Sequence, residues 1–298
     1  MVVAATGFFD GVHLGHRKVL GSLCDIARSE GKRSAVISFW PHPRSVLQQE
    51  AYNLRLLNTS EEKEALLKGI GIDDIIYIPF TKEFSKLSTK EFMQQYLIDK
   101  YNVSVLVIGY DHRLGNNISE SQQQMISTAE SLGLRVVRVS EFLMDDNIIS
   151  STKIRKLLQQ TDVEGAARFL GYNYFIKGVV VSGNRIGRTI GFPTANMKLY
   201  NPLKEVPGNG VYAVYVSVLG RRYIGITNIG TRPTVGTGNE CTIETHILDF
   251  NEDIYGLDIS VEFVSKIRDE RKFASLDELK VELAANRDYA YEKLLSGL

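Results

Sequence analysis

The sequence has few cysteines, no long apolar run and no excess of charge. Only two of its 298 residues are cysteine, Cys24 and Cys241, and no Cys-x-x-Cys spacing occurs. Two isolated cysteines predict neither a disulfide framework nor a structural zinc site, and they favour a reducing cytoplasm as the compartment. No run approaches the ~20 apolar residues of a membrane span. No basic segment precedes an apolar one at the N-terminus, so we expect neither a membrane partner nor a secretion signal.

The formal net charge is zero, with 35 Lys and Arg against 35 Asp and Glu. A balanced chain argues against bulk electrostatic binding to DNA or RNA, so we expect no nucleic-acid partner. The length of 298 residues is enough for about two domains, each with a core of its own.

The first half alternates short apolar runs with helical patterns. Capping-box pairs at Thr59 with Glu62, and at Ser88 with Glu91, mark two helix starts. The alternation predicts a parallel sheet with helices on both faces, an α/β domain of residues 1–170. The predicted strands are residues 2–5, 34–39, 75–78, 103–108 and 134–139, and the predicted helices include 17–29, 119–132 and 163–170.

After Gly171 the runs become rich in β-branched and aromatic residues and no helices separate them. Leu219-Gly220-Arg221 is a plausible hairpin turn. The pattern predicts a small antiparallel barrel or sandwich within a second domain, residues 171–298, that ends in one helix. The predicted strands are 175–181, 211–218, 223–229, 242–250 and 259–265. Ser275 and Glu278 would cap the final helix, and Leu276, Leu279, Leu283 and Leu294 would form its apolar face.

A glycine-rich segment with two histidines, residues 7–16 (GFFDGVHLGH), follows the first predicted strand. Ligands of open parallel sheets bind at the carboxyl ends of strands. His13 and His16 share a face on a first helical turn, where imidazoles and helix amides can donate to phosphate oxygens. Two histidines three apart also occur on ordinary loops, but the glycines and the position after a strand favour a nucleotide site. The phosphate ligands expected here are Gly7, Phe9, Asp10, Gly15 and the two histidines.

Two later segments of the first half fit the same site. Residues 149–155 (ISSTKIR) place Ser151, Thr152 and Arg155 at a helix start, an arrangement suited to an anion, although an ordinary N-cap explains the segment equally well in isolation. Residues 109–115 (GYDHRLG) follow the buried strand 103–108. Aromatic and polar groups there could hold a flat ring and a sugar, or could simply form a turn.

The second half carries its own phosphate signature at residues 183–196, which end in GFPTAN. The loop has glycines and arginines but lacks the lysine and the strand–helix context of a P-loop. Thr194 and Asn196 present hard oxygen donors of the kind Mg²⁺ prefers, although a plain turn is an alternative. Glu244 lies on a predicted strand, on one face with Thr242 and His246, and is a candidate general base.

The motifs resemble known families. Residues 13–16 resemble the HxGH motif of the nucleotidyltransferase superfamily, and 149–155 resembles its downstream partner. The second half resembles riboflavin kinase at residues 183–196, 228–234, 244–250 and 267–273. End to end, the chain resembles the prokaryotic bifunctional riboflavin kinase/FMN adenylyltransferases. The resemblance implies a Rossmann-like nucleotidyltransferase domain with a parallel sheet, followed by a riboflavin kinase-like β-barrel.

The resemblance also implies the reactions. The second domain would convert riboflavin and ATP to FMN and ADP, and the first would join FMN to AMP from a second ATP, giving FAD and pyrophosphate. The three rival hypotheses are a kinase with an inactive first domain, a flavin sensor without turnover, and a tRNA-linked synthetase. The intact histidines argue against an inactive first domain. The intact base with its metal ligands argues against a sensor, and the absence of a KMSKS-like segment argues against a tRNA-linked synthetase.

Residue roles follow from the same resemblance. Thr194 and Asn196 would coordinate Mg²⁺, with ATP as co-substrate, and Glu244 would be the general base. Asp111 would lie at the flavin of the first domain, where the sequence departs from the usual DFxFG pattern at His112 and Leu114. The remaining roles are contacts of His13 and His16 with the reacting phosphates, of Ser151, Thr152 and Arg155 with pyrophosphate, of Gly183, Arg185, Gly187 and Arg188 with ATP, and of Arg271 with the kinase flavin.

Overall fold

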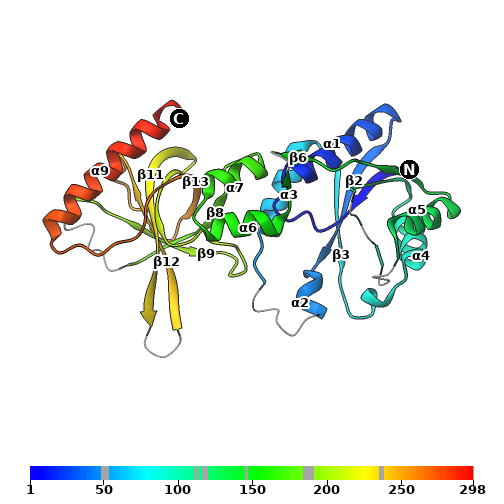
Figure 1. The fold of residues 1–298 in the computed structure, drawn as a ribbon, viewed down its shortest axis with the longest axis horizontal. Coiled ribbons are helices and arrows are strands. Elements are labelled where there is room, and N and C mark those ends of the chain that lie inside the picture. The colour runs from blue at the N-terminus through cyan, green and yellow to red at the C-terminus, as the bar shows by residue number, and fades with distance from the viewer. Residues whose placement is uncertain are drawn as a thin grey trace. The chain divides into compact units, whose positions relative to one another are not determined.

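The strands of the first half form one five-stranded parallel sheet in the order β3-β2-β1-β4-β5 (Figure 1). The computed structural model describes residues 1–47, 54–110, 112, 114–115, 120–144, 147–183, 191–234 and 238–297. The strands are β1 (Val2–Thr6), β2 (Arg33–Trp40), β3 (Asp74–Pro79), β4 (Val103–Ile108) and β5 (Arg135–Arg138). The predicted α/β class and parallel sheet are therefore confirmed.

Helices cover both faces of this sheet. Helices α1 (Leu14–Ser29) and α3 (Ser60–Ile70) bury Leu20, Leu23 and Leu67 against one face. The opposite face is covered by α4 (Thr89–Phe92), the π-helix η3 (Met93–Lys100) and α5 (Gln122–Ser131), through the side chains of Met93, Leu97 and Met125. Shorter elements are α2 (Pro43–Leu47), η2 (Phe84–Lys86), β6 (Leu143–Met144) and β7 (Asn147–Ile148).

Local capping chemistry determines where these helices begin. Both predicted capping boxes are present, at Thr59 with Glu62 and at Ser88 with Glu91. Helix α1 begins at Leu14, three residues before the predicted start, because the His13 side chain caps it. The predicted helix 119–132 begins only at Gln122, because Ser121 is its N-cap and accepts from the Gln124 amide.

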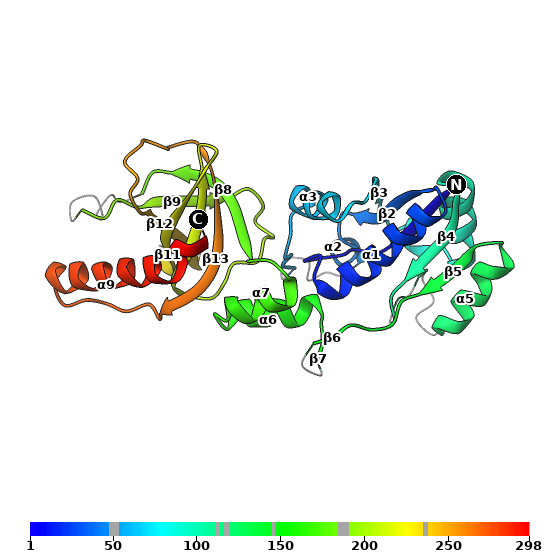
Figure 2. The ribbon, with the colours of Figure 1, turned by 90° about the horizontal axis from the view of Figure 1, so that it is seen from above.

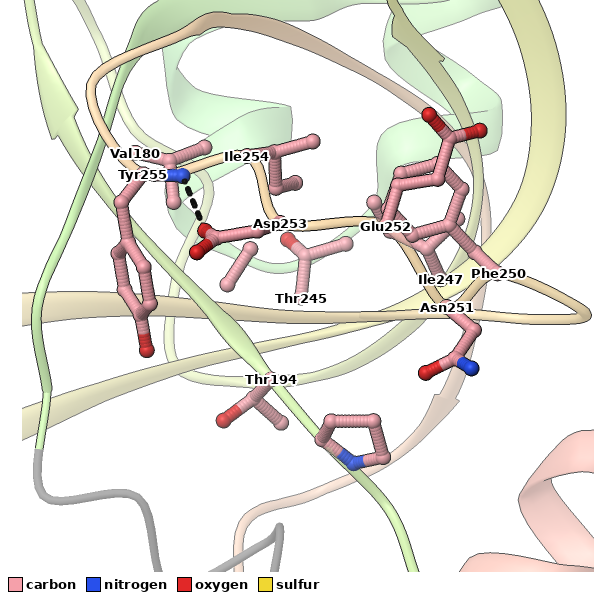
Figure 3. Close-up of a pocket in the computed structure, with 12 residues that line it drawn as sticks. Val180, Thr194, Thr245, Ile247, Phe250, Asn251, Glu252, Asp253, Ile254 and Tyr255 are labelled. Atoms are coloured by element: carbon pink, nitrogen blue, oxygen red, sulfur yellow. Dashed lines mark hydrogen bonds between the residues drawn. The ribbon is translucent and has the colours of Figure 1, made fainter.

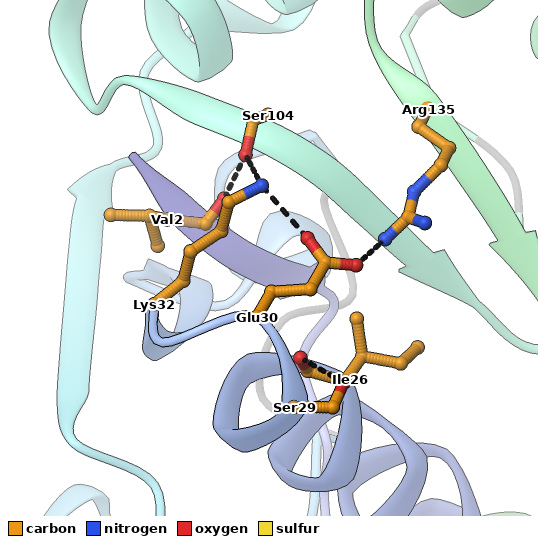
Figure 4. A network of polar contacts seen from close by, with 7 residues as sticks. All are labelled: Val2, Ile26, Ser29, Glu30, Lys32, Ser104 and Arg135. Atoms are coloured by element: carbon orange, nitrogen blue, oxygen red, sulfur yellow. Dashed lines mark hydrogen bonds and ion pairs between the residues drawn. The ribbon is translucent and has the colours of Figure 1, made fainter.

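A polar network ties the amino ends of the strands together (Figure 4). Glu30, just after α1, accepts from Lys32 at 2.8 Å and also from Arg135 of β5. Lys32 in turn donates to the Ser104 hydroxyl of β4 at 3.0 Å. These contacts brace the edge of the sheet where strands begin. The carboxyl ends, where the strand order reverses between β1 and β4, remain the edge expected to bind ligands.

The second half forms a closed barrel of six strands in the order β10-β11-β12-β9-β8-β13, with every neighbouring pair antiparallel. The structure thus decides between the predicted barrel and sandwich. Strand β9 was not predicted. The strands are β8 (Phe175–Val181), β9 (Ala195–Leu199), β10 (Gly210–Val218), β11 (Arg221–Thr234), β12 (Gly238–Ile247) and β13 (Asp258–Arg268).

The turn between β10 and β11 lies within the predicted segment 219–221 but has only two residues, because Arg221 already belongs to β11. Leu219 and Gly220 have φ values of +53° and +73°. Positive φ at both central positions is the geometry that matches the twist of a two-residue hairpin.

The terminal helix α9 (Leu276–Leu294) packs on β10 and β11 through Ala290 and Leu294 (Figure 2). The prediction that Leu276 belongs to its buried face is wrong, since Leu276 is 57% exposed. Ser275 accepts from the Glu278 amide, but the Glu278 carboxylate accepts from the Ala274 amide, so the predicted capping box is only half formed. A 3₁₀ turn, η4 (Leu295–Gly297), follows α9.

The chain divides into two compact units, Met1–Ser151 and Thr152–Leu298. The division falls at the start of α6 (Ser151–Gln159), so α7 (Val163–Leu170) belongs to the second unit. The domain boundary after residue 170 stays a prediction. None of the helices in the described part of the chain has the length and apolar content needed to cross a membrane.

Candidate active sites

His13 and His16 form a stacked pair where β1 leads into α1. Their ring centroids are 3.6 Å apart with an interplanar angle of 16°. The Nδ1 atom of His13 accepts a hydrogen bond from the backbone N–H of His16 at 3.3 Å. An accepting Nδ1 places the proton of the neutral ring on Nε2, which is then available as a donor to a ligand.

Both histidines are held neutral. Burial lowers the pKa of His13 to about 4. The pKa of His16 lies well below its ordinary value, first because of burial and then because a protonated His16 would be repelled by His13 in its protonated form and by Lys63. At neutral pH the pair therefore offers N–H donors without carrying charge, which suits oxygens whose negative charge grows during a reaction.

One position of this turn leaves little room for a side chain. A Cβ atom on Gly15 would lie 3.2 Å from Nδ1 and 3.3 Å from Cε1 of His13. Such contacts are tighter than ordinary van der Waals distances, so a larger residue would push the His13 ring away. The spacing His-x-Gly-His thus has a steric basis, since the first ring lies over the glycine.

The loop that leads to His13 holds strained backbone and is fixed from outside. Phe9 and Val12 have φ values of +52° and +39°, which side chains with a Cβ adopt only at a cost. The Asp10 carboxylate accepts from the backbone N–H groups of Leu57 at 2.9 Å and Asn58 at 3.2 Å. Asp10 is buried and serves the framework of the loop through these contacts.

The distant serine motif reaches the same loop. The Ser151 hydroxyl donates to the Asp10 carbonyl at 2.8 Å, across 141 residues of sequence. In the second unit, the Arg155 guanidinium donates to the Thr152 hydroxyl at 3.4 Å, one turn along α6. Ser151 is thereby placed at the first phosphate signature.

The turns after β1 and β4 are joined at the point where the strand order reverses. Nε2 of His112 lies 2.9 Å from the Thr6 hydroxyl, and burial lowers the pKa of His112 to about 4. The Gln122 amide donates to the carbonyls of Gly109 at 2.9 Å and His112 at 3.3 Å. His112, where the sequence departs from the DFxFG pattern, is therefore an internal link between two ligand-edge turns.

In the barrel, strand pairing assembles the second site. Glu244 of β12 is the register partner of Asn196 on β9 and of Asn228 on β11. Ile243, Thr245 and Ile247 are buried, while Glu244 is half-buried on the other face of the strand. Two residues 48 positions apart in sequence, the predicted base and a predicted metal ligand, thus lie side by side.

Gly183 lets Asn196 approach the preceding segment. A Cβ atom on Gly183 would lie 2.2 Å from Nδ2 of Asn196, a distance that real Cβ atoms do not show. The Asn196 amide therefore lies directly against the backbone where the phosphate signature begins.

A cavity of about 380 Å³ is lined by Thr194 and Ala195, which precede Asn196, and by Thr245 and Ile247, on the face of β12 opposite to Glu244. In Figure 3, Thr194 borders it from one side and Asp253, whose carboxylate accepts from the Tyr255 amide at 3.1 Å, from the other. Val180, Ile247 and Phe250 supply apolar walls. Mixed apolar and polar walls of this kind are typical of sites for a nucleoside or a drug-sized molecule.

His246 fastens the segment that carries Thr194. Its Nδ1 donates to the Pro193 carbonyl at 2.7 Å, and its ring meets Phe192 edge-on at 5.2 Å. Burial lowers the pKa of His246. The sequence pattern placed His246 on the face of Glu244 but assigned it no role.

The predicted flavin residue Arg271 is tied to the terminal helix. Its guanidinium pairs with Glu282 of α9 at 2.6 Å, and Arg268 pairs with the other oxygen of the same carboxylate at 2.7 Å. The neighbouring Glu270 accepts from the Asn228 side chain at 3.3 Å. Predicted residues outside the described part of the chain are Asp111, Arg185, Gly187 and Arg188.

Sequence reasoning also missed Lys63, which is 2% exposed beside the first phosphate loop. Nothing in the sequence separates this lysine from Lys68, the solvated lysine of the same helix, because the burial of Lys63 depends on β2, β3 and the loop after β1.

The two units define a protein that handles nucleotides at two separate sites, one on a parallel sheet and one on a barrel. Residues 1–153 match the family model for FAD synthetase, and residues 170–294 match the model for riboflavin kinase. The chain belongs to the bifunctional riboflavin kinase/FMN adenylyltransferase family.

Relatives support this membership over nearly the whole chain. The bifunctional riboflavin kinase/FMN adenylyltransferase of Bacillus subtilis is 39% identical over 290 residues, covering 97% of this chain and 91% of the relative. The Escherichia coli K12 protein of the same name is 36% identical over 291 residues, covering 97% and 92%. A crystal structure described as a macrolide-efflux protein from Streptococcus pneumoniae is similar with 30% identity and a TM-score of 0.90, covering 96% and 93%.

Proposed function

We propose that this chain makes FAD in two ATP-dependent steps, phosphorylation of riboflavin in the barrel and adenylylation of FMN on the parallel sheet. Membership of the family supports both activities. The observation that carries the proposal is that each unit keeps its reactive groups together: His13 stacked on His16 in one, and Glu244 paired with Asn196 in the other.

In the kinase step, Glu244 takes the proton of the riboflavin 5′-hydroxyl. The oxygen then attacks the γ-phosphorus of ATP, the bond to the bridging oxygen of ADP breaks, and FMN and ADP result. We assign the cavity beside Thr194 to the nucleoside of ATP, with Phe250 and Ile247 against the base. Gly183 and the arginines at 185 and 188 would cover the phosphates.

The residues at the barrel site fit Mg²⁺. Thr194 and Asn196 bring hydroxyl and amide oxygens, the hard donors that Mg²⁺ prefers when substrate phosphates and water complete its shell. No group of three or more His, Cys, Asp or Glu residues that could hold a metal occurs in the described ranges. When bound, the ion would neutralise charge on the phosphates. His246 holds Thr194 in place through Pro193.

In the adenylyl step, a phosphate oxygen of FMN attacks the α-phosphorus of ATP and pyrophosphate leaves. The neutral His13 and His16 would donate to the oxygens on which charge develops. Ser151, Thr152 and Arg155 would hold the departing pyrophosphate, and Gly7, Phe9 and Asp10 would shape the loop around the phosphates. We also propose that Asp111 contacts the flavin of the first domain and that Arg271 contacts the flavin of the kinase domain. The proposed location of the protein is the cytoplasm.

The decisive experiment is incubation of the chain with riboflavin, ATP and Mg²⁺, followed by separation of the flavins. FMN should form first and FAD second, with one ADP and one pyrophosphate for each FAD. FMN alone would show an inactive first domain. Flavin binding without either product would favour a sensor.

A further inference from the structure

Lys63 is a buried cation to which neither reaction above assigns a role beyond the effect of its charge on the pKa of His16. It lies on α3 and is 2% exposed. Burying an ammonium group is costly unless its hydrogen bonds are satisfied. Burial indeed lowers the pKa of Lys63 to about 8. The contacts of the Lys63 ammonium show which groups satisfy it.

The contacts of Lys63 converge on the first phosphate loop. Its Nζ donates to the Phe8 carbonyl at 2.9 Å and to the buried Ser38 hydroxyl of β2 at 3.3 Å. The same ammonium lies 4.0 Å from the ring centroid of Phe8 and 5.3 Å from that of Tyr77 on β3. Lys63 therefore connects the loop after β1 to two neighbouring strands.

The segment that leads into α3 makes a further contact with the loop. The Asp10 carboxylate already accepts from the amides of Leu57 and Asn58. Between the two anchors lies Phe9, whose φ of +52° requires external support. Loss of the Phe8 anchor would let the loop relax at its strained residue, four residues before the histidine pair begins.

We propose that Lys63 is a positioning residue for adenylyl transfer, its ammonium holding the Phe8 carbonyl so that the loop presents His13 and His16 to the reacting phosphates. This inference rests on the adenylyltransferase function proposed above. The ammonium is enclosed by protein groups, so Lys63 acts through the loop and not on ATP. A misplacement of about 1 Å in such a loop can lower a rate on the order of 10²-fold.

The test compares Lys63→Met with Lys68→Met, an exposed lysine of the same helix that pairs with Glu64. Pyrophosphate release from ATP and supplied FMN gives kcat and KM, and FMN formation from riboflavin in the same preparation reports the barrel. The single tryptophan, Trp40, lies in β2, so its fluorescence reports folding of the first unit alone. If Lys63→Met is not folded by this measure, Lys63→Gln takes its place.

The folded variant should lose adenylyl transfer on the order of 10²-fold in kcat, while KM for FMN and the kinase rate stay within about twofold of wild type. Lys68→Met should match wild type throughout. The inference is overturned by an unchanged kcat, by a change in KM alone, or by a loss that disappears at temperatures where Trp40 shows the first unit fully folded. Failure of the wild-type chain to make FAD from FMN would instead refute the proposed function.

Discussion

The histidine pair shows how much chemistry depends on single atoms. His13 uses Nδ1 to cap α1, which directs its remaining proton to Nε2, and its ring covers both Gly15 and the His16 ring. Glu244 depends on a partner in the same way, since its position opposite Asn196 comes from strand pairing. At the scale of single residues, each prediction removes one side-chain group and expects the loss of one of the two reactions.

Replacement of His16 by alanine should remove FAD formation and leave FMN formation. One lost donor to a developing oxyanion costs on the order of 10²–10³ in kcat. Pyrophosphate release with supplied FMN measures the first reaction, and riboflavin phosphorylation in the same tube is the internal control. Loss of both activities would contradict the assignment of two sites.

Glu244→Gln should stop riboflavin phosphorylation while adenylylation of supplied FMN continues. The amide keeps the shape of the side chain but cannot take the proton, and general-base catalysis contributes on the order of 10²–10⁴. Glu262→Gln is the matched control on β13, since Glu262 pairs only at the surface, with Arg222. An unchanged kinase rate in Glu244→Gln would rule out Glu244 as the base.

Elements of structure carry out tasks that no single residue performs. Helix α1 begins with its cap in the first site and continues as one of the helices covering a face of the sheet. Strands β9 and β12 meet over a short register that brings Asn196 to Glu244 and closes the barrel. A substitution at one position of an element can therefore raise its stability, while a substitution at another position of the same element lowers activity.

Two glycines of α1 separate these effects. Gly21→Ala should stabilise the first unit by about 1 kcal/mol through helix propensity, because no atom outside the helix lies within 4 Å of the new Cβ. Gly15→Ala should lower adenylyl transfer because its Cβ displaces the His13 ring. Urea unfolding followed by Trp40 fluorescence measures stability, and pyrophosphate release measures activity. Equal activities of the two variants would contradict the steric account of the motif.

Over the whole molecule, histidines are unevenly distributed. Four of the five lie in the first unit, His13, His16, His42 and His112, and only His246 lies in the second. Burial lowers the pKa of His13 and of His112 to about 4. These two histidines therefore take up protons near pH 6.5 in the unfolded chain, but only near pH 4 in the folded unit. Stability of the first unit is complete above pH 6.5 and declines as the pH falls.

Between pH 7.5 and 5, each of these two histidines should reduce the unfolding free energy of the first unit by about 2 kcal/mol. Urea unfolding by Trp40 fluorescence at both pH values measures the decline. His112→Phe removes one titrating group and should flatten the dependence by about 2 kcal/mol, whatever the variant's stability at neutral pH. An unchanged slope would show that His112 is not kept neutral by the fold.

The sequence by itself determined the features that arise within a few residues. Local hydrogen-bond and periodicity signals predicted the capping pairs Thr59 with Glu62 and Ser88 with Glu91, the strand–helix alternation, and a turn at residues 219–221. The structure contains each of them, with the turn formed by Leu219 and Gly220. The two phosphate signatures were visible for the same reason, because each loop is continuous in the chain.

Only the tertiary structure decided what depends on distant partners. Closure of the barrel required β9, whose five residues carry too little periodicity to be predicted. The burial of Lys63, the Ser151 contact with Asp10 and the pairing of Glu244 with Asn196 each join segments far apart in sequence. Burial and long-range pairing are set by packing of whole elements, so a residue's neighbours along the chain do not reveal them.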